Sequence, residues 1–273
     1  MAYSEGKCAV ITGAGSGIGR ALALQLNREG CSLYICDINC ETLAETAALL
    51  ERREVACDRQ VLDVADRAAV HAWAERIDSE RGSVDIVINN AGVGLGARVE
   101  EMAYDDLDWL MGINFWGVIH GTMAFLPLLK RAPQGHLVNL SSLFGMIAVP
   151  TQSAYNAAKF GVRGFTESLR QEMAGTNVHV CCAHPGGIAT NIARDSRGGG
   201  ASPEERHERF QRFARTSAAS AAAQIARAIE KRKPRLMLGA DSKIAALVAQ
   251  LFPVRYPAIL GLGKVTAEAG GTT

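Results

Sequence analysis

The chain has 273 residues, which is long for one domain but within the range of a single large α/β unit. Its 29 basic and 28 acidic residues leave a net charge of +1, so charge gives no general attraction to nucleic acid or to an anionic membrane. Hydrophobic residues make up 48% of the sequence, enough to bury a sizeable core. These values favour a globular protein and exclude a nucleic-acid partner.

The N-terminal stretch MAYSEGKCAVITG has no basic region followed by a long apolar run, so we expect no secretory signal and a cytoplasmic location. The seven cysteines lie mostly in apolar runs and form no C-x-x-C pair. They are therefore expected to be reduced core residues rather than a disulfide framework. No His, Cys and carboxylate cluster has the spacing of metal ligands, so no metal is expected.

Short apolar runs alternate with longer helical patterns along the chain. Strands are predicted at 8–12, 32–36, within 55–64, at 84–89, 136–141, 178–185 and 235–238, and helices at 18–29, 41–52, 66–81, 105–131, 153–173 and 217–231. This alternation predicts a parallel sheet covered on both faces. Right-handed crossovers then give a doubly wound α/β sheet, the Rossmann fold, with 1–273 as a single domain.

The first predicted strand leads directly into the glycine turn TGAGSGIGR. Strand, glycine turn and helix start are what the pyrophosphate of a dinucleotide needs: glycines let the main chain approach the phosphates, and a helix N-terminus attracts anions. The spacing is G-x-x-x-G-x-G over Gly13, Gly17 and Gly19 rather than G-x-G-x-x-G. A turn that serves only close packing is the alternative.

Asp37 ends the second predicted strand, 18 residues after Gly19. A carboxylate there can bond the adenosine ribose hydroxyls and would repel a 2′-phosphate, which favours NAD over NADP. The alternative is that Asp37 caps the following helix, although Asn39 is the better cap candidate.

Further motifs occur in order along roughly residues 5–190. They are TG-x-x-x-GIG at 12–19, NNAG at 89–92, the asparagine of INFWG, a serine thirteen residues before a tyrosine, YNAAK at 155–159, and PG-x-x-x-T at 185–190. Together they resemble the motifs of the classical short-chain dehydrogenase/reductase family. The resemblance implies an oxidoreductase with a nicotinamide cofactor. Because the motifs end at residue 190, it implies nothing about the substrate.

This resemblance implies a catalytic tetrad of Asn114, Ser142, Tyr155 and Lys159. Tyr155 would be the acid/base, and Lys159, one helical turn away, would lower its pKa from about 10 and bind the nicotinamide ribose. Ser142 would hold the substrate oxygen. Asn114 would hold a water that links Lys159 to solvent.

The same resemblance implies which residues contact the cofactor and which surfaces pair. The implied cofactor contacts are Gly13, Ser16, Gly17, Ile18, Gly19, Asp37, Asp63, Val64, Asn90, Ala91, Gly92, Tyr155, Lys159, Pro185, Gly186, Ile188 and Thr190. The two long helices near 105–131 and 153–173 commonly form the dimer surface in this family. A homodimer or homotetramer is therefore expected.

Two segments lie outside that pattern. Residues 191–216 are predicted to be a substrate lid, because Ser202, Pro203 and Glu205 form a helix start with a capping box after a glycine hinge at 198–200. Residues 240–273 are a C-terminal extension with three open interpretations: a cover over the pocket, an interface or a membrane surface. Peripheral membrane contact is the less favoured of these, since only Lys243, Arg255 and Lys264 supply charge.

The sequence thus predicts an NAD-dependent oxidoreductase acting on a secondary alcohol or ketone. An apolar substrate is expected because the lid and extension contain Phe210, Phe213, Leu247, Leu251 and Phe252. The first alternative is an NADPH-dependent carbonyl reductase, against which Asp37 argues. The second is a catalytically inactive nucleotide-binding sensor, which would usually have lost part of the tetrad.

Overall fold

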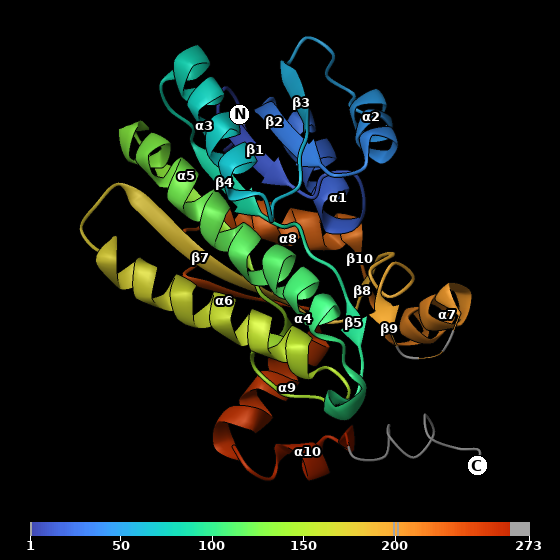
Figure 1. Ribbon diagram of the computed structural model, residues 1–273. Coiled ribbons are helices and arrows are strands. Elements are labelled where there is room, and N and C mark those ends of the chain that lie inside the picture. The colour runs from blue at the N-terminus through green and yellow to red at the C-terminus, as the bar shows by residue number, and fades with distance from the viewer. Residues whose placement is uncertain (1, 199, 201, 263–273) are drawn as a thin grey trace.

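The computed structural model describes residues 2–198, 200 and 202–262, and its centre is a seven-stranded parallel sheet (Figure 1). The strands are β1 (Cys8–Thr12), β2 (Ser32–Asp37), β3 (Cys57–Val61), β4 (Ile86–Asn89), β6 (Gly135–Leu140), β7 (Val178–Pro185) and β11 (Arg235–Leu238). Their order is β11-β7-β6-β4-β1-β2-β3, so β1 lies between β2 and β4 and the winding direction reverses there. Parallel sheets of this kind bind ligands at the carboxyl ends of the strands beside such a reversal. The predicted doubly wound fold and all seven predicted strands are confirmed.

Helices cover both faces of the sheet. The helices α1 (Gly17–Arg28), α2 (Cys40–Ala48) and α8 (Ala218–Glu230) pack on one face, and α3 (Arg67–Arg81), α4 (Tyr104–Met111), α5 (Gly117–Arg131) and α6 (Ser153–Glu172) lie on the other. Successive strand residues alternate between the two cores: Ala9 and Ile11 belong to the first, Cys8 and Val10 to the second. Because each strand is buried on both sides, its apolar run is continuous.

The predicted helix at 105–131 forms one helical run from 104 to 131, interrupted by a π-helical segment, η2 (Gly112–Trp116). By length and composition this run could cross a bilayer, but 56% of its most apolar window is buried inside the fold. It contacts β4, β6 and α3 and therefore serves as a core helix. Local π-helical turns inside α-helices are frequent at functional sites, and this one contains Asn114.

Several two- or three-residue elements shape the loops at the carboxyl end of the sheet. They are β5 (Leu95–Gly96), η1 (Val99–Glu101), η3 (Leu143–Gly145), β8 (Ile188–Ala189), β9 (Arg197–Gly198) and β10 (Thr216–Ser217). The strand β5 pairs with β9, and β8 pairs with β10, so both ends of the lid segment are fastened to loops of the main fold.

The helix α7 (Pro203–Phe213) lies in the segment predicted to be a lid, a role that stays a prediction, and begins with the predicted capping box between Ser202 and Glu205. The chain before α7 is held down by Arg197, whose guanidinium lies 3.9 Å from the centre of the Trp109 ring and 3.0 Å from the Asp106 carboxylate. Gly198 and Gly200 both have positive φ, of 74° and 65°, which suits the predicted turn. Gly199 and the side chain of Phe213 lie outside the described part.

The C-terminal extension forms two helices, α9 (Ala240–Leu251) and α10 (Tyr256–Ile259), which project beyond the carboxyl end of the sheet (Figure 1). The Asp241 carboxylate accepts a hydrogen bond from the Gly187 amide (2.8 Å), and the Tyr256 hydroxyl accepts one from the Ala148 amide (2.9 Å). The extension is thereby joined to two loops of the main fold. That 1–273 is one domain stays a prediction, since residues 263–273 lie outside the described part.

All seven cysteines are free, and five of them are buried in the core. Cys57 is half-buried, whereas Cys40 is exposed because it occupies the first position of α2, on the solvent side. That the cysteines are reduced stays a prediction, and the expectation that they lie in the core is wrong for Cys40.

Candidate active site

The glycine turn after β1 forms a cradle that only glycine can line. Gly13 and Gly17 have positive φ, of 66° and 52°. A Cβ at Gly13 would lie 2.7 Å from Ala91 Cα, and one at Gly19 would collide with the Gly13 carbonyl oxygen. The N-cap of α1, Ser16, is exposed and makes no side-chain cap bond, so its side chain satisfies none of the first amides of the helix. This cradle fits the pyrophosphate of a dinucleotide. Its glycines let the phosphates approach the main chain, and the first amides of α1 are not capped by the Ser16 side chain.

The NNAG loop is tied to the glycine turn by reciprocal hydrogen bonds. The Asn90 amide group donates to the carbonyls of Thr12 (2.9 Å) and Gly13 (3.0 Å). In return, the Thr12 hydroxyl accepts from the main-chain amides of Asn90 (3.0 Å) and Ala91 (3.1 Å). The two loops therefore form one unit, and Thr12 positions it although it was not among the predicted contacts.

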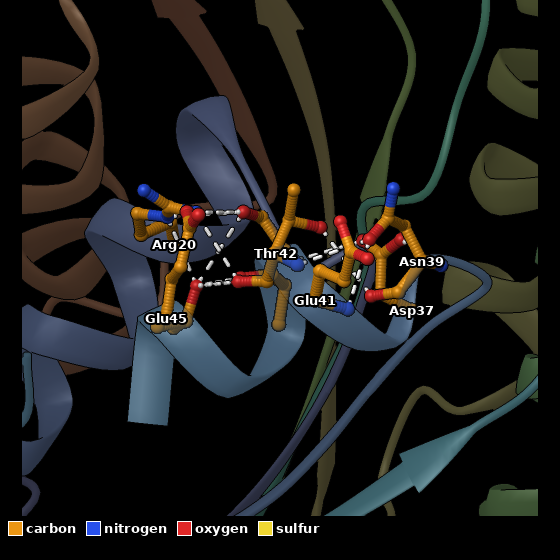
Figure 2. A network of polar contacts seen from close by, with 9 residues as sticks. Arg20, Asp37, Asn39, Glu41, Thr42 and Glu45 are labelled. Atoms are coloured by element: carbon orange, nitrogen blue, oxygen red, sulfur yellow. Dashed lines mark hydrogen bonds and ion pairs between the residues drawn. The ribbon is translucent and has the colours of Figure 1, made fainter. Parts of the chain in front are cut away.

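Asp37 lies at the end of β2, beside the glycine turn (Figure 2). One carboxylate oxygen accepts from the Gly15 amide (2.8 Å) and the other from the Asn39 amide (3.0 Å). Asn39, not Asp37, caps α2 through bonds to the amides of Glu41 and Thr42, as the sequence favours. The alternative role of Asp37 as a helix cap is therefore wrong.

Arg20 is the basic side chain of this network, and it is already engaged (Figure 2). Its guanidinium donates to the carbonyls of Gly15 (2.6 Å) and Thr42 (3.2 Å), and it pairs with the Glu45 carboxylate at 2.8 Å. The positive charge is thus compensated within the protein, and Asp37 gives this corner of the site its negative charge.

Two of the predicted contacts follow β3. Asp63 is exposed and accepts from the Ala65 amide at 2.9 Å, which shapes the turn. Val64 is buried, and a Cβ at Gly117 would lie 2.7 Å from its Cγ2. Both residues lie at the carboxyl end of the sheet, on the β3 side of the glycine turn.

The segment from Pro185 to Thr190 closes the opposite side of the cradle. Ile188 is buried, while Gly186 packs against the Asp241 carboxylate, which leaves no space for a side chain. A Cβ at Gly17 would lie 3.1 Å from Thr190 Cγ2, so this segment touches the glycine turn. A groove of about 290 Å³ runs between them and is lined by Gly17, Arg20, Ala21, Leu24, Ala189, Thr190, Asn191 and Ala218.

Ser142, Tyr155 and Lys159 come together where β6 ends and α6 begins. Lys159 is 3% exposed; its Nζ donates to the Leu140 carbonyl (3.0 Å) and lies 5.8 Å from the centre of the Tyr155 ring. The Ser142 hydroxyl accepts from the Phe144 amide at 3.1 Å and is close enough to the phenol of Tyr155 to lower its pKa. A Cβ at Gly92 would lie 3.5 Å from Lys159 Nζ, so the group adjoins the NNAG loop.

Burial dominates the proton affinities at this site. Removal from water lowers the pKa of Lys159 to about 8 and raises the pKa of Tyr155 above its usual value, while the hydrogen bond from Ser142 opposes the latter. In this arrangement the ammonium of Lys159 is directed at the Leu140 carbonyl, and burial outweighs its effect on Tyr155. That Lys159 and the oxidised nicotinamide together lower the pKa of Tyr155 stays a prediction.

Asn114 is fully buried in the π-helical segment η2. Its side chain forms a reciprocal pair with Val93, accepting from the Val93 amide (2.8 Å) and donating to the Val93 carbonyl (2.8 Å). The side chain thus fixes the loop after β4. A water that links Lys159 to solvent would have to be bound by the main chain of Asn114.

Three supporting residues were not among the predicted site residues. The Asn156 amide donates to the carbonyls of Phe144 (2.7 Å) and Ile147 (2.8 Å) and accepts from the Val149 amide (3.2 Å), which holds the loop after Ser142. Ser141 donates to the Lys159 carbonyl (2.8 Å), and the buried His184 bonds the Ser142 carbonyl through Nδ1 (3.0 Å). Only the position of Asn156 inside YNAAK could have indicated its role from the sequence.

Comparison with known proteins places these features in a family. Residues 7–199 match the family model described as short chain dehydrogenase. A Mycobacterium tuberculosis chain named as the oxidoreductase SadH is 43% identical over 267 residues, which cover 96% of this chain and 97% of that one.

Solved structures agree with the sequence comparison. A short-chain dehydrogenase/reductase from Burkholderia phymatum in complex with NAD superposes with a TM-score of 0.83 at 30% identity, covering 92% of this chain and 95% of that one. Carveol dehydrogenase from Mycobacterium avium, also in complex with NAD, superposes with a TM-score of 0.79 at 25% identity over 89% of this chain and all of that one.

Proposed function

The chain belongs to the short-chain dehydrogenase family and is an NAD(P)-dependent oxidoreductase, and we propose that it transfers a hydride between NAD and a secondary alcohol or ketone. The observation that carries the chemical part is the convergence of Ser142, Tyr155 and Lys159 beside the NNAG loop. The observation that carries the choice of cofactor is the pair of Asp37 and the engaged Arg20.

The nicotinamide cofactor supplies a carbon that accepts or returns the hydride. The glycine turn and the N-terminus of α1 hold the pyrophosphate, and Asp37 accepts hydrogen bonds from the adenosine ribose. The NNAG loop and the segment from Pro185 to Thr190 form the two sides of the cleft at the nicotinamide end. The NNAG loop is already bonded to the glycine turn, and the segment from Pro185 to Thr190 packs against that turn, so binding requires little ordering.

Tyr155 handles the proton of the substrate oxygen. In oxidation its phenol accepts the hydroxyl proton, and in reduction it donates the proton back. The raised pKa keeps the phenol protonated near neutral pH, which prepares the protein alone for donation to a ketone. Ser142 holds the substrate oxygen beside Tyr155, and Lys159 supplies positive charge below its pKa of about 8.

Several observations support NAD over NADP. The Asp37 carboxylate would repel a 2′-phosphate, and the guanidinium of Arg20 is compensated by Glu45. Ile38, the residue after Asp37, is apolar and exposed and offers no charge to a phosphate. The NAD complexes among the similar structures are consistent with this preference.

The apolar character of the substrate rests on one contact. The Phe144 ring meets the Tyr155 ring edge-on with 6.1 Å between centres, which places an apolar wall beside the phenol. Leu247, Leu251 and Phe252 are exposed, and their part in an apolar lining stays a prediction. The exposed Trp116, Met123 and Phe160 on the long helical run and α6 support the expected homodimer or homotetramer, and a cytoplasmic location stays a prediction.

The cofactor preference is tested by titration with NADH and NADPH, followed by fluorescence. We expect the wild type to bind NADH at least about tenfold more tightly, and we expect Asp37→Ala to remove or reverse that ratio. Glu41→Ala is the matched control, since Glu41 is an exposed carboxylate near Asp37. Preference for NADPH would favour the carbonyl reductase alternative, and an unchanged ratio in Asp37→Ala would refute its role.

The chemistry is tested with a panel of secondary alcohols and ketones in the presence of the preferred cofactor. Tyr155→Phe should lower kcat by about a thousandfold while NADH affinity changes by less than about threefold, because only the proton donor is lost. Tight NADH binding by the wild type without turnover on any member of the panel would favour the sensor alternative.

A further inference from the structure

Large exposed apolar side chains are concentrated at the C-terminal helices. The described part of the chain exposes fourteen large apolar residues, and six of them lie between 244 and 259. We call these six the C-terminal apolar face; they are Ile244, Leu247, Leu251, Phe252, Val254 and Ile259. A single exposed apolar side chain needs no explanation, but six within one pair of helices are typical of an interaction site.

The helix α9 presents its large side chains outward. Ile244, Leu247 and Leu251 follow one another at helical spacings of three and four residues, so they share one side of α9. The side turned toward the fold carries the small buried residues Ala245 and Ala246. A core helix would have the opposite arrangement, with its large residues inside.

The charge around this face is positive in balance. Between residues 241 and 262 the charged residues are Lys243, Arg255 and one carboxylate, that of Asp241. Asp241 is exposed, and its carboxylate accepts a hydrogen bond from the Gly187 amide. The two cations therefore outnumber the single carboxylate beside the C-terminal apolar face.

The face lies on the same side of the molecule as the active site. The strand β11 leads into α9 at the carboxyl end of the sheet, and α10 is joined through Tyr256 to Ala148 in the loop after Ser142. In Figure 1, α9 and α10 form the part of the fold that projects farthest beyond that end of the sheet. A planar surface could approach them there without passing the helices that cover the sheet.

We propose that the C-terminal apolar face docks this protein on the surface of an anionic lipid bilayer. Apolar side chains of an interfacial helix enter the boundary between headgroups and acyl chains, and nearby cations gain from anionic headgroups. This proposal does not depend on the proposed substrate. It places the entrance of the active site next to the bilayer.

A second copy of the chain fits this face less well. Two copies of the same face would bring the four cations Lys243 and Arg255 of both chains together with only two carboxylates, those of Asp241. The chain's own last residues are a poor cover too. The sequence from 263 to 273, GKVTAEAGGTT, contains a single large apolar residue, too few to cover the six side chains of the C-terminal apolar face. An anionic membrane supplies both the apolar medium and the opposite charge.

The test is flotation of the full-length chain with vesicles of phosphatidylcholine, alone or mixed with phosphatidylglycerol. We expect the wild type to float with the mixed vesicles and less at high salt. Leu247→Gln with Leu251→Gln should lower the partition coefficient at least about tenfold, because the charge is kept and apolar area is lost. Lys243→Gln and Arg255→Gln should each lower binding to the mixed vesicles about fivefold and leave binding to phosphatidylcholine unchanged.

Leu49→Gln is the matched control, since Leu49 is 53% exposed at the end of α2, away from the C-terminal helices. It should float like the wild type, and every variant should bind NADH with wild-type affinity, which verifies folding. Wild-type protein that stays at the bottom of the gradient with both vesicle types would overturn the proposal. A double variant that splits an oligomer in light scattering, without any flotation of the wild type, would assign the face to a second copy instead.

Discussion

The two ends of the central sheet are built with similar polar contacts, yet only one has the features of an active site. At the carboxyl end, buried His184 and Asn156 bond the main chain around Ser142. At the amino end, buried His136 bonds Tyr3 (2.6 Å), and Asn177 donates to the carbonyls of Leu129 (3.2 Å) and Ala132 (2.6 Å). A density of polar side chains is therefore not sufficient to identify the reactive end.

The direction of the main chain makes the difference. At the carboxyl end, the N-terminus of α1 faces the glycine cradle and the strands lead into loops that carry the tetrad. The amino end has a groove of about 480 Å³ whose lining includes His136, His179, Arg170 and Arg232. Matched substitutions at the two ends can be compared for their effects on stability and on activity. A residue that only holds a loop should affect stability alone, whereas a residue that positions the reacting groups should affect both.

The largest contrast is expected between two asparagines. Asn156→Ala leaves two buried carbonyls and one amide without partners, so the free energy of unfolding should fall by about 3 kcal/mol. Because the loop after Ser142 is released, kcat/KM should fall about a hundredfold. Urea unfolding and steady-state kinetics measure the two effects.

Asn177→Ala is the counterpart at the amino end. Asn177 is exposed, so the carbonyls it bonds can turn to water and the loss should be about 1 kcal/mol. Activity should be unchanged. Equal losses of activity in both variants would show that loop bonding at either end acts on the site through general stability.

The second contrast concerns acid. Burial lowers the pKa of His136 and of His184 to about 4, below the usual value of about 6.5. Between about pH 4 and pH 6.5, each of these histidines therefore binds a proton in the unfolded chain but not in the folded chain. Stability should therefore be full above about pH 6.5 and fall toward pH 4, by up to about 1.4 kcal/mol per pH unit for each histidine.

Urea unfolding across this pH range tests the assignment. His136→Gln and His184→Gln should each make the dependence less steep by a similar amount, and only His184→Gln should also lower kcat, because it contacts the Ser142 carbonyl. A slope that neither variant changes would assign the acid sensitivity to other groups.

The smallest effect is expected at the lid. Arg197→Ala removes the contact with Trp109 and the ion pair with Asp106, both partly exposed, so KM should rise about three- to fivefold with kcat nearly unchanged. The control is Arg194→Ala, whose ion pair with Asp195 links only sequence neighbours. A wild-type KM in Arg197→Ala would mean that the β5–β9 and β8–β10 pairs fasten the segment without help from Arg197.

The sequence was sufficient for features that repeat along the chain or occur at fixed spacing. Apolar periodicity predicted the seven strands and the main helices, and the motifs at 12–19, 89–92 and 155–159 predicted which segments meet at the carboxyl end. The two-residue pairs β5–β9 and β8–β10 were missed, because two residues have no period. The helices α9 and α10 were not predicted as helices, since Pro253 and Pro257 interrupt an irregular pattern.

The finer properties of the site depend on contacts that only the folded chain forms. The side chain of Asn114 is engaged by Val93, and the ammonium of Lys159 by the Leu140 carbonyl. Neither bond follows from spacing. The water expected at Asn114 and the expected lowering of the Tyr155 pKa stay predictions, and the structure adds that the Asn114 side chain is already engaged and that burial raises the pKa of Tyr155. Asn156 was missed because its bonds do not follow from spacing either.

The distribution of thiols gives this protein a natural attachment point. Six cysteines are buried or half-buried, and burial raises the pKa of Cys57 to about 11, whereas Cys40 is exposed at the start of α2. A maleimide dye should therefore attach selectively at Cys40, three residues after Asp37. Such a dye would report occupancy of the adenosine end directly, through slower labelling or a change in emission, in the unmodified sequence.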